Sequence, residues 1–476
     1  MISFIVSVLA LLVGYYFYGR FVEKVFGIEP DRATPAKRIA DGVDFVEMSW
    51  PKVLLIQFLN IAGVGPIFGA ILGAYWGPWA FVWIVFGCIF AGAVHDYLSG
   101  MMSLRSDGAS IAEIVGNYLG NAARQIMRVF SVILLLLVGV VFMTSPAQIL
   151  SSLIDPDGTT TVYYVVLGVI VAYYILATLL PIDKIIGRIY PVFGAVLLIM
   201  AFGIVTMLFT TGEIANVPEF NFENLHPKGN YLFPFLFITI ACGAISGFHA
   251  TQSPIMARCL RTEKEGRRVF YGAMIAEGVV ALIWAAAAMA HFGGQEGLAA
   301  AGAPAVVVKT VSLDLMGAVG GVLAILGVVA CPITSGDTAF RSARLTLSDW
   351  LGFDQAPFRN RLTVAVPLFV LGVALCFIDF QIIWRYFAWS NQTLATVALW
   401  AGAAYLAKYG KNYWIALVPA AFMTAVVTSY ILCAKEGLGL PYEGSLAVGV
   451  VTAFALFVWF LYAWRSVKAS VDATTG

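Results

Sequence analysis

The chain has 476 residues, of which 61% are hydrophobic and 12% are charged, whereas roughly 25% are charged in an ordinary soluble domain. Its formal net charge is +1 and its mean hydropathy is +0.88. This composition excludes a soluble enzyme, a nucleic-acid-binding protein, a disordered chain and a fibrous repeat. It also excludes a transmembrane β-barrel, whose strands alternate polar and apolar residues. We therefore predict an all-α integral membrane protein that contacts the lipid bilayer.

Apolar stretches of about 20 residues, the length that crosses a hydrocarbon core of about 30 Å, recur along the whole chain. We predict about 13 transmembrane helices in a single membrane domain, residues 1–476. The first stretch has its basic residues after it, so it is expected to be a retained helix and not a cleaved signal peptide. The predicted spans lie near residues 2–20, 52–73, 77–101, 124–149, 161–181, 185–212, 231–257, 268–291, 316–341, 360–380, 382–408, 412–434 and 443–465.

The basic residues indicate the orientation. If the chain alternates sides at each span, 24 of the 28 Lys and Arg residues lie on one side. Only Lys228, Lys309 and Lys435 lie on the other side, and Arg385 lies inside a span. Because cytoplasmic loops carry an excess of basic residues, we predict an external N-terminus and a cytoplasmic C-terminus in a bacterial or archaeal inner membrane.

Glycine and proline interrupt the second span and the seventh. The second contains Gly63, Gly65 and Pro66, and the seventh contains Gly243 and Gly247. Proline removes a backbone donor and clashes with the preceding turn, so such a stretch breaks a helix. An unwound segment at membrane depth must line a cavity or be shielded by protein. Either break taken alone is also consistent with a simple packing kink.

The two breaks occupy corresponding positions, because each opens a run of five spans. Five is an odd number, so the second run is predicted to be inverted relative to the first. Paired broken helices in inverted halves are the strongest sequence indicator of a secondary transporter's binding site. We predict an extra N-terminal helix at 1–20, a first repeat at 50–212, a second repeat at 230–408 and two C-terminal helices at 411–466.

The breaks suggest a site for a small-molecule substrate that carries a carboxylate. The half-helix that starts near Gly65 presents free N–H groups and the positive end of its dipole, which suit an anion. Carbonyls near Ala62 suit a small cation. The predicted substrate-binding residues are those of the two breaks together with polar residues beside them: Gly63, Gly65, Pro66, Gly243, Ser246, Gly247, His249, Asn391 and Gln392.

A second polar group lies in the ninth span. Thr334, Ser335, Asp337 and Thr338 place hard oxygen atoms within about one helical turn. This is the composition of a Na⁺ site or a proton acceptor, and it is equally typical of a capped, partly hydrated helix end. With carbonyls near Ala62, these four residues form the predicted cation site. No resident cofactor is expected beyond a bound Na⁺ or a coupling proton.

Other polar residues at membrane depth are functional candidates because their burial is costly. His95 and Asp96 end the third span, and Asp96 is expected to pair with Arg341 or to act as a gate. Glu277 either carries a proton or pairs with a neighbour. His249 is expected to contact substrate or the broken backbone. Asn391 and Gln392 are also consistent with hydrogen bonds that only hold helices together.

Five segments containing these residues resemble the carbon starvation protein A (CstA) family. They are residues 41–46, 61–67, 91–96, 243–249 and 388–395, in one order along the chain. The resemblance implies an importer of pyruvate, or of peptides, in a bacterial or archaeal inner membrane. It also implies kinship with the amino acid–polyamine–cation transporters, whose core is a five-plus-five inverted repeat. In many of those relatives, the segment that contains Thr334 and Asp337 forms a sodium site with the first broken helix.

The chain departs from the family pattern beside both breaks. Ile56 and Gln57 stand where the family has a His pair, and residues 250–254 differ from the usual small-residue and Thr-rich stretch. The leading hypothesis is cation-coupled symport of a small carboxylate, with proton or sodium as the coupling ion. The alternatives are a peptide importer and a nutrient sensor that does not transport. An intramembrane enzyme is not expected, because the four histidines are isolated and neither an HExxH nor a GxSxG motif is present.

Overall fold

A computed structural model describes residues 1–42, 44–155, 159–179, 183–353 and 357–475. These residues contain helices and no strands. Side-chain placement is described for the same residues except 179, 183–191, 349 and 465–475. The α-helices are α1 Ile2–Phe26, α2 Pro35–Arg38, α3 Trp50–Ile61, α4 Gly65–Gly73, α5 Trp79–Phe86, α6 Ala93–Arg105, α7 Ile111–Leu119, α8 Asn121–Ile154, α9 Thr160–Leu179, α10 Asp183–Thr210, α11 Phe235–Thr239, α12 Gly247–Ala257, α13 Gly272–His291, α14 Gln295–Ala301, α15 Pro304–Leu351, α16 Phe358–Leu375, α17 Phe380–Lys408, α18 Trp414–Cys433 and α19 Tyr442–Thr475.

Shorter helical segments join these helices. They are the 3-10 turns η1 Ala74–Trp76, η3 Glu213–Asn216 and η4 Glu263–Glu265, and the π-helical turns η2 Gly87–Gly92 and η5 Arg267–Tyr271. The short helix α7 begins where a capping box predicts it, because the Glu113 N–H donates to Ser110 Oγ at 3.4 Å. The long helix α15 is interrupted at Gly317, whose φ of 67° is not helical.

Every predicted span coincides with a helix or a broken helix. Among the described residues, ten helices are long and apolar enough to cross a membrane, and the bent pair α3–α4 makes an eleventh. Two predicted spans are not among these eleven. The span at 231–257 falls on α11–α12, whose first half has five residues, and the span at 382–408 falls on α17, which contains a polar stretch. An all-α membrane fold is thus confirmed, whereas the number 13 stays a prediction.

Both predicted breaks are present. The helices α3 and α4 are bent by 51° at residues 62–64, and α11 and α12 are separated by residues 240–246. The expected limits were slightly wrong, because Pro66 and His249 belong to the helices that follow. Pro66 occupies the first turn of α4, where a missing N–H has no helical partner to lose.

The two runs of helices share local irregularities and packing. A π-helical turn lies in the second span of each run, η2 before α6 and η5 before α13. The helix α6 packs against α12, and α13 packs against α4; α8 packs against α17, and α10 against α15. The first two contacts are counterparts of each other, and so are the last two, as an inverted repeat predicts.

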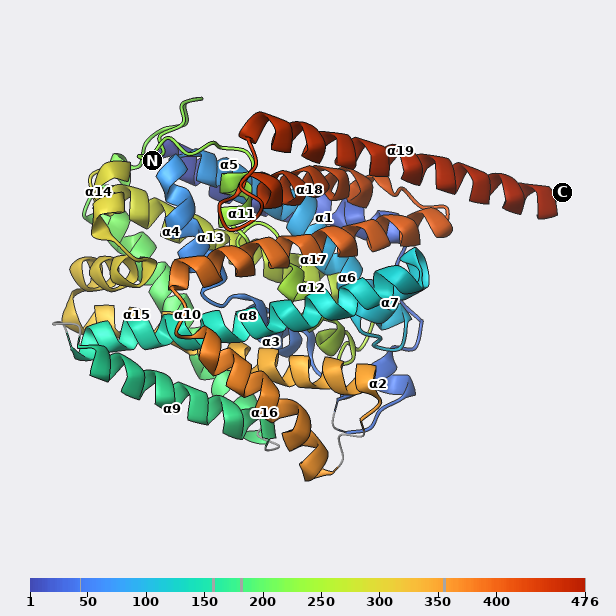
Figure 1. The fold of residues 1–476 in the computed structure, drawn as a ribbon, viewed down its shortest axis with the longest axis horizontal. Coiled ribbons are helices and arrows are strands. Elements are labelled where there is room, and N and C mark those ends of the chain that lie inside the picture. Colours follow the sequence, from blue (N-terminus) through green and yellow to red (C-terminus); the bar gives the residue numbers. More distant parts are fainter. Residues whose placement is uncertain (43, 156–158, 180–182, 354–356, 476) are drawn as a thin grey trace.

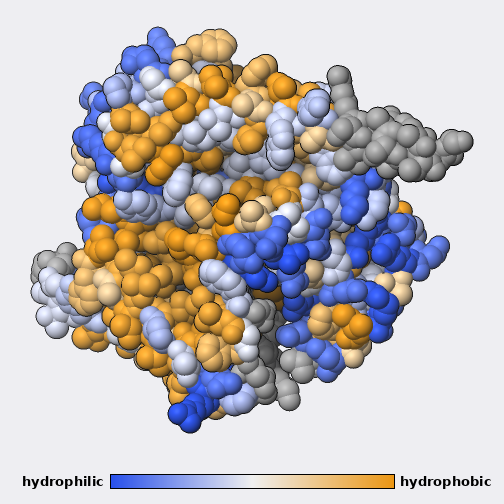
Figure 2. Space-filling view, turned by 45° about the vertical axis from the view of Figure 1, so that its right-hand side comes forward, coloured by the Kyte–Doolittle hydropathy of each residue, from blue (hydrophilic) through white to orange (hydrophobic). Residues whose placement is uncertain are grey.

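The termini lie toward opposite ends of the long axis of Figure 1. The helices α8 and α17 run beside each other along this axis. The short helix α14 lies near the N-terminus, and α2 and α7 lie toward the C-terminal end. The spans of α5–α6 and α13 are largely buried, whereas α1, α9 and α19 expose most of their apolar residues. Figure 2 shows hydrophobic residues over the centre and lower left of one face, and hydrophilic residues at its right and at its upper left edge. The outer helices therefore present an apolar surface to lipid.

Candidate functional site

Four ionisable side chains meet beside the second break. His95 and Asp96 come from the first turn of α6, His249 from the first turn of α12, and Glu277 from α13. All four are 0–1% exposed. We call these residues the buried tetrad. Ionisable groups withdrawn from water in this way are costly, so they are retained where they bind or transfer charge.

Asp96 is the centre of the buried tetrad. Its Oδ1 lies 2.7 Å from His95 Nδ1, and its Oδ2 lies 2.9 Å from His249 Nδ1. On the other side of the His249 ring, Nε2 lies 3.3 Å from Oε2 of Glu277. Asp96 therefore pairs with two histidines and not with Arg341, which had been the expected partner.

The hydrogen bonds fix where protons lie in the buried tetrad. An ionised carboxylate only accepts, so both histidines carry a proton on Nδ1. In a neutral His249 ring, Nε2 would be an acceptor that faces a second acceptor, Oε2 of Glu277. Two acceptors at 3.3 Å repel each other unless one of them is protonated. A proton on either His249 Nε2 or Glu277 would remove this repulsion.

The depth of the buried tetrad follows from helix geometry. Asp96, His249 and Glu277 each lie nine residues from an arginine at one end of the molecule: Arg105, Arg258 and Arg268. At 1.5 Å per residue, this is about 14 Å. Half of a hydrocarbon core of about 30 Å is about 15 Å, so the tetrad lies close to the bilayer midplane.

The two broken helices touch each other close to the tetrad. A Cβ atom at Gly65 would overlap Sγ of Cys242, and one at Gly63 would overlap the ring of Phe142. Glycine is therefore needed at both positions of the first break. Among the described residues, the backbone N–H groups of Val64 and Gly65 make no hydrogen bond. The start of α4 thus offers two donors and a positive dipole end to an anion.

Polar side chains of α17 bind the second broken helix. Asn391 Oδ1 accepts hydrogen bonds from the Phe248 N–H at 2.7 Å and from Ser246 Oγ at 3.2 Å. The Gln392 side chain donates to the carbonyl oxygens of Phe237 and Ile240. Both side chains thus form hydrogen bonds with backbone groups that the break leaves without a helical partner. These bonds correspond to the alternative prediction, in which the two residues only hold helices together.

Packed side chains cover the breaks on both sides. On one side, the rings of Phe380 and Trp384 each lie 6.0 Å from the ring of Phe68 on α4. On the other, Gln57 Nε2 donates to Ser253 Oγ at 3.2 Å, which ties α3 to α12. Gln57 and Ser253 belong to the two segments that depart from the family pattern, and the fold brings these segments together.

The predicted cation-site residues make separate contacts. Ser335 Oγ donates to the Leu59 carbonyl at 3.1 Å, so it reaches the first broken helix. Asp337 accepts from Tyr173 at 3.0 Å and from Thr338 at 3.1 Å, on the side of α9. Thr334 Oγ1 donates to the Cys331 carbonyl of its own helix. The hydrogen bond of Ser335 thus joins this group of residues to the first broken helix.

Several contacts could not be assigned from the sequence. Cys88 Sγ donates to the Gly243 carbonyl at 3.3 Å, so a small side chain from the π-helical turn η2 binds the second break. Arg341 donates to the Ala177 carbonyl at 3.0 Å, toward α9. Arg385 lies 3.3 Å from Glu436 and is half exposed. For the contact between Cys88 and Gly243, the only signal in the sequence was that Gly87 and Cys88 lie within a predicted span.

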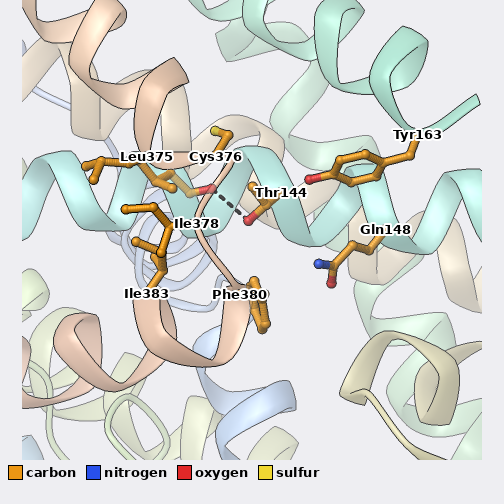
Figure 3. Close-up of a pocket in the computed structure, with 9 residues that line it drawn as sticks. Thr144, Gln148, Tyr163, Leu375, Cys376, Ile378, Phe380 and Ile383 are labelled. Carbon is orange, nitrogen blue, oxygen red and sulfur yellow. Dashed lines mark hydrogen bonds between the residues drawn. The ribbon is translucent and has the colours of Figure 1, made fainter. Parts of the chain in front are cut away.

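A small cavity lies apart from the buried tetrad, between α8, α9 and the turn from α16 to α17. Thr144, Gln148 and Tyr163 point into it opposite Phe380, and the Thr144 hydroxyl donates to the Val140 carbonyl (Figure 3). Its volume is about 40 Å³, which is about the space of one water molecule. It is therefore too small for a substrate.

Comparison with known proteins identifies relatives over most of the chain. A family model described as carbon starvation protein CstA matches residues 1–189, 158–292 and 283–430. A protein of Haemophilus influenzae described as a membrane protein is 46% identical over 63% of this chain and 93% of the relative. The peptide transporter CstA of Escherichia coli is 26% identical over 88% of this chain and 79% of the relative. The pyruvate/proton symporter BtsT of Escherichia coli is 29% identical over 59% and 47%.

Solved structures of transporters share the fold. A manganese transporter of Eremococcus coleocola superposes with a TM-score of 0.52 at 12% identity, covering 90% of this chain and 99% of its own. The inward facing conformation of Mhp1 superposes with a TM-score of 0.51 at 14% identity, covering 88% and 93%. At these identities the likeness concerns the fold alone.

Proposed function

Because the chain belongs to the carbon starvation protein CstA family, we propose that it is a secondary active transporter that imports pyruvate or a similar small carboxylate together with protons. The family and its named relatives are membrane transporters.

The observation that carries the proposal is the contact between His249 and Glu277. One proton belongs to these two residues, near the bilayer midplane and one turn beyond the second break. Loss of that proton would leave an uncompensated acceptor pair in a buried site, which costs several kcal/mol. Protonation and the position of α12 against α13 are therefore coupled, as a proton-driven transporter requires.

The surroundings of the first break favour a small anion as substrate. The unpaired N–H groups of Val64 and Gly65 suit one carboxylate group. The close approach of Gly65 to Cys242 and of Gly63 to Phe142 leaves little room beside these donors. This crowding favours pyruvate over a peptide, which is the alternative that the named CstA relatives suggest.

Energetics explains why an anion importer needs a coupling ion. An anion that enters a negative cell interior works against about 2.3 kcal/mol per 100 mV. Entry with one proton removes this cost, and entry with two protons gains from the potential. The strong bias of basic residues supports a cytoplasmic C-terminus and an external N-terminus in the inner membrane.

The test is uptake of labelled pyruvate into proteoliposomes. We expect a pH gradient, acidic outside, to drive accumulation, and a sodium gradient at equal pH to have no effect. A dipeptide in excess should not compete. Accumulation that requires sodium would refute proton coupling, and competition by dipeptides at the pyruvate concentration would favour the peptide importer.

A further inference from the structure

An apolar groove of about 940 Å³ lies on the lipid-facing side of the second span. This volume is in the range of small-molecule sites, roughly 300–1,000 Å³. Four helices form its walls: α1, α3, α10 and α13. Its lining is almost wholly hydrophobic and includes Phe4, Tyr15, Trp50, Phe58, Phe202 and Ile283.

The groove has the length of one leaflet of the bilayer. On α1 it runs from Phe4 to Tyr15, and on α13 from Gly272 to Ile283. Each run covers eleven helical steps, or about 17 Å. Half of the hydrocarbon core is about 15 Å. The end at Gly272 lies about one turn from Arg268, so the groove begins near the basic end of the molecule and continues past the level of Glu277.

Cationic side chains surround that end of the groove. The guanidinium of Arg268 lies 5.0 Å from the ring centre of Trp50, and that of Arg267 lies 5.0 Å from the ring centre of Tyr15. Arg267 also pairs with Glu23 at 3.0 Å. Within the described residues, the exposed Arg268 has no carboxylate partner. The mouth of the groove therefore has an unbalanced positive charge.

We propose that an anionic phospholipid of the phosphatidylglycerol class occupies this groove. Its acyl chain lies along α1 and α13, and its phosphate lies at Arg268. An apolar groove about 17 Å long with a basic, aromatic mouth matches both parts of such a lipid. A free phosphate would use only the mouth, and a second copy of this chain would leave Arg268 without a counter-charge.

The lipid would touch the first broken helix. Trp50 and Phe58 line the groove from α3, the half-helix that ends at the first break. An acyl chain in the groove packs α3 against α13, the helix that carries Glu277. The lipid site does not depend on the proposed substrate, and binding alone tests it.

The experiment is native mass spectrometry of the full chain, released from micelles with equal amounts of phosphatidylglycerol and phosphatidylcholine of identical acyl chains. We expect retained phosphatidylglycerol to exceed phosphatidylcholine. Arg268→Gln should lower this ratio roughly fivefold, the effect of one basic residue at a membrane surface. Lys264→Gln removes an exposed charge in the same loop, outside the groove, and should leave the ratio unchanged.

Two further variants separate the contribution of the lipid's acyl chain from that of its headgroup. Ala276→Phe fills the groove and should lower the retention of both lipids, whereas Arg268→Lys keeps the charge and the preference. Thermal unfolding of each variant checks that it is folded. Equal retention of the two lipids, an unchanged ratio in Arg268→Gln, or full competition by glycerol phosphate alone would overturn the proposal. A wild-type dimer that retains no phospholipid would also overturn it.

Discussion

His249 Nδ1 donates a 2.9 Å hydrogen bond to Asp96 Oδ2, and this bond joins α12, immediately after the second break, to α6. The same imidazole faces Glu277 of α13 with its other nitrogen. One histidine ring thus connects three helices near the middle of the membrane. Any movement of α12 relative to α6 or α13 must alter the contacts of His249 with Asp96 and Glu277.

Asp96→Asn should impair both folding stability and transport. The amide offers one acceptor where the carboxylate offers two, and its NH₂ group faces a second donor. A hydrogen bond to a charged group contributes about 1.5–3 kcal/mol. We expect a loss of that size in the free energy of unfolding, measured by denaturant titration in micelles, and the loss of proton-driven uptake.

The matched control for this variant is Asp314→Asn. Asp314 also contacts a histidine, His291, at 3.1 Å, but its side chain is 58% exposed. Exposed pairs contribute about 0–1 kcal/mol. If both variants behave alike, the buried tetrad has no special role in stability or transport.

Asn391→Ala should destabilise the second broken helix. It leaves the buried N–H of Phe248 without a partner, which costs about 1–3 kcal/mol. Gln381→Ala is the control on the same helix and should change the free energy of unfolding by less than about 0.5 kcal/mol. A stable Asn391→Ala protein that fails to bind pyruvate would instead assign Asn391 to the substrate.

The sequence was sufficient to predict the helices and both breaks, for local reasons. Apolar stretches of the right length identify the spans, and Gly63, Pro66 and Gly243 mark where a helix cannot continue. The position of the break relative to Pro66 was missed by a few residues, because proline is tolerated in the first turn of the helix that follows.

The partners within the site depend on packing between distant segments. Asp96, His249 and Glu277 were each candidates, but 153 residues separate the first two. The sequence gives no rule for choosing His249 over Arg341 as the partner of Asp96. That choice follows from the contact of α6 with α12, while Arg341 of α15 is directed toward α9. The role of Cys88 likewise needed the tertiary structure.

Asp337→Asn should leave gradient-driven uptake largely intact. Asp337 accepts hydrogen bonds from Tyr173 and Thr338, so its oxygen atoms are engaged at the contact with α9. We expect uptake to be the same in sodium and potassium buffers for the wild type and for Asp337→Asn. If Asp337→Asn abolishes accumulation while exchange persists, the coupling cation binds at Asp337, as the sequence had suggested.

The ion pair between Glu219 and the Met1 ammonium should persist until the pH falls to a low value. It accepts hydrogen bonds from the Met1 ammonium at 2.8 Å and from Ser3, and these lower its pKa from 4.5 to about 2. A lowered pKa stabilises the folded state above pH 4.5, and this contribution is lost as the pH falls toward 2. Glu219→Gln should therefore speed the labelling of the terminal amine at pH 7. Glu223→Gln, in the same loop, should not; equal rates in all three proteins would contradict the contact.

The central claim is that the proton shared by His249 and Glu277 drives accumulation of the carboxylate. Its most direct test is Glu277→Gln, which removes the titratable group at nearly constant volume. The measurement is labelled pyruvate in proteoliposomes, once with a pH gradient and once as exchange against unlabelled pyruvate inside. We predict that Glu277→Gln retains exchange but does not concentrate pyruvate at any pH gradient. Accumulation by Glu277→Gln with the pH dependence of the wild type would contradict the account.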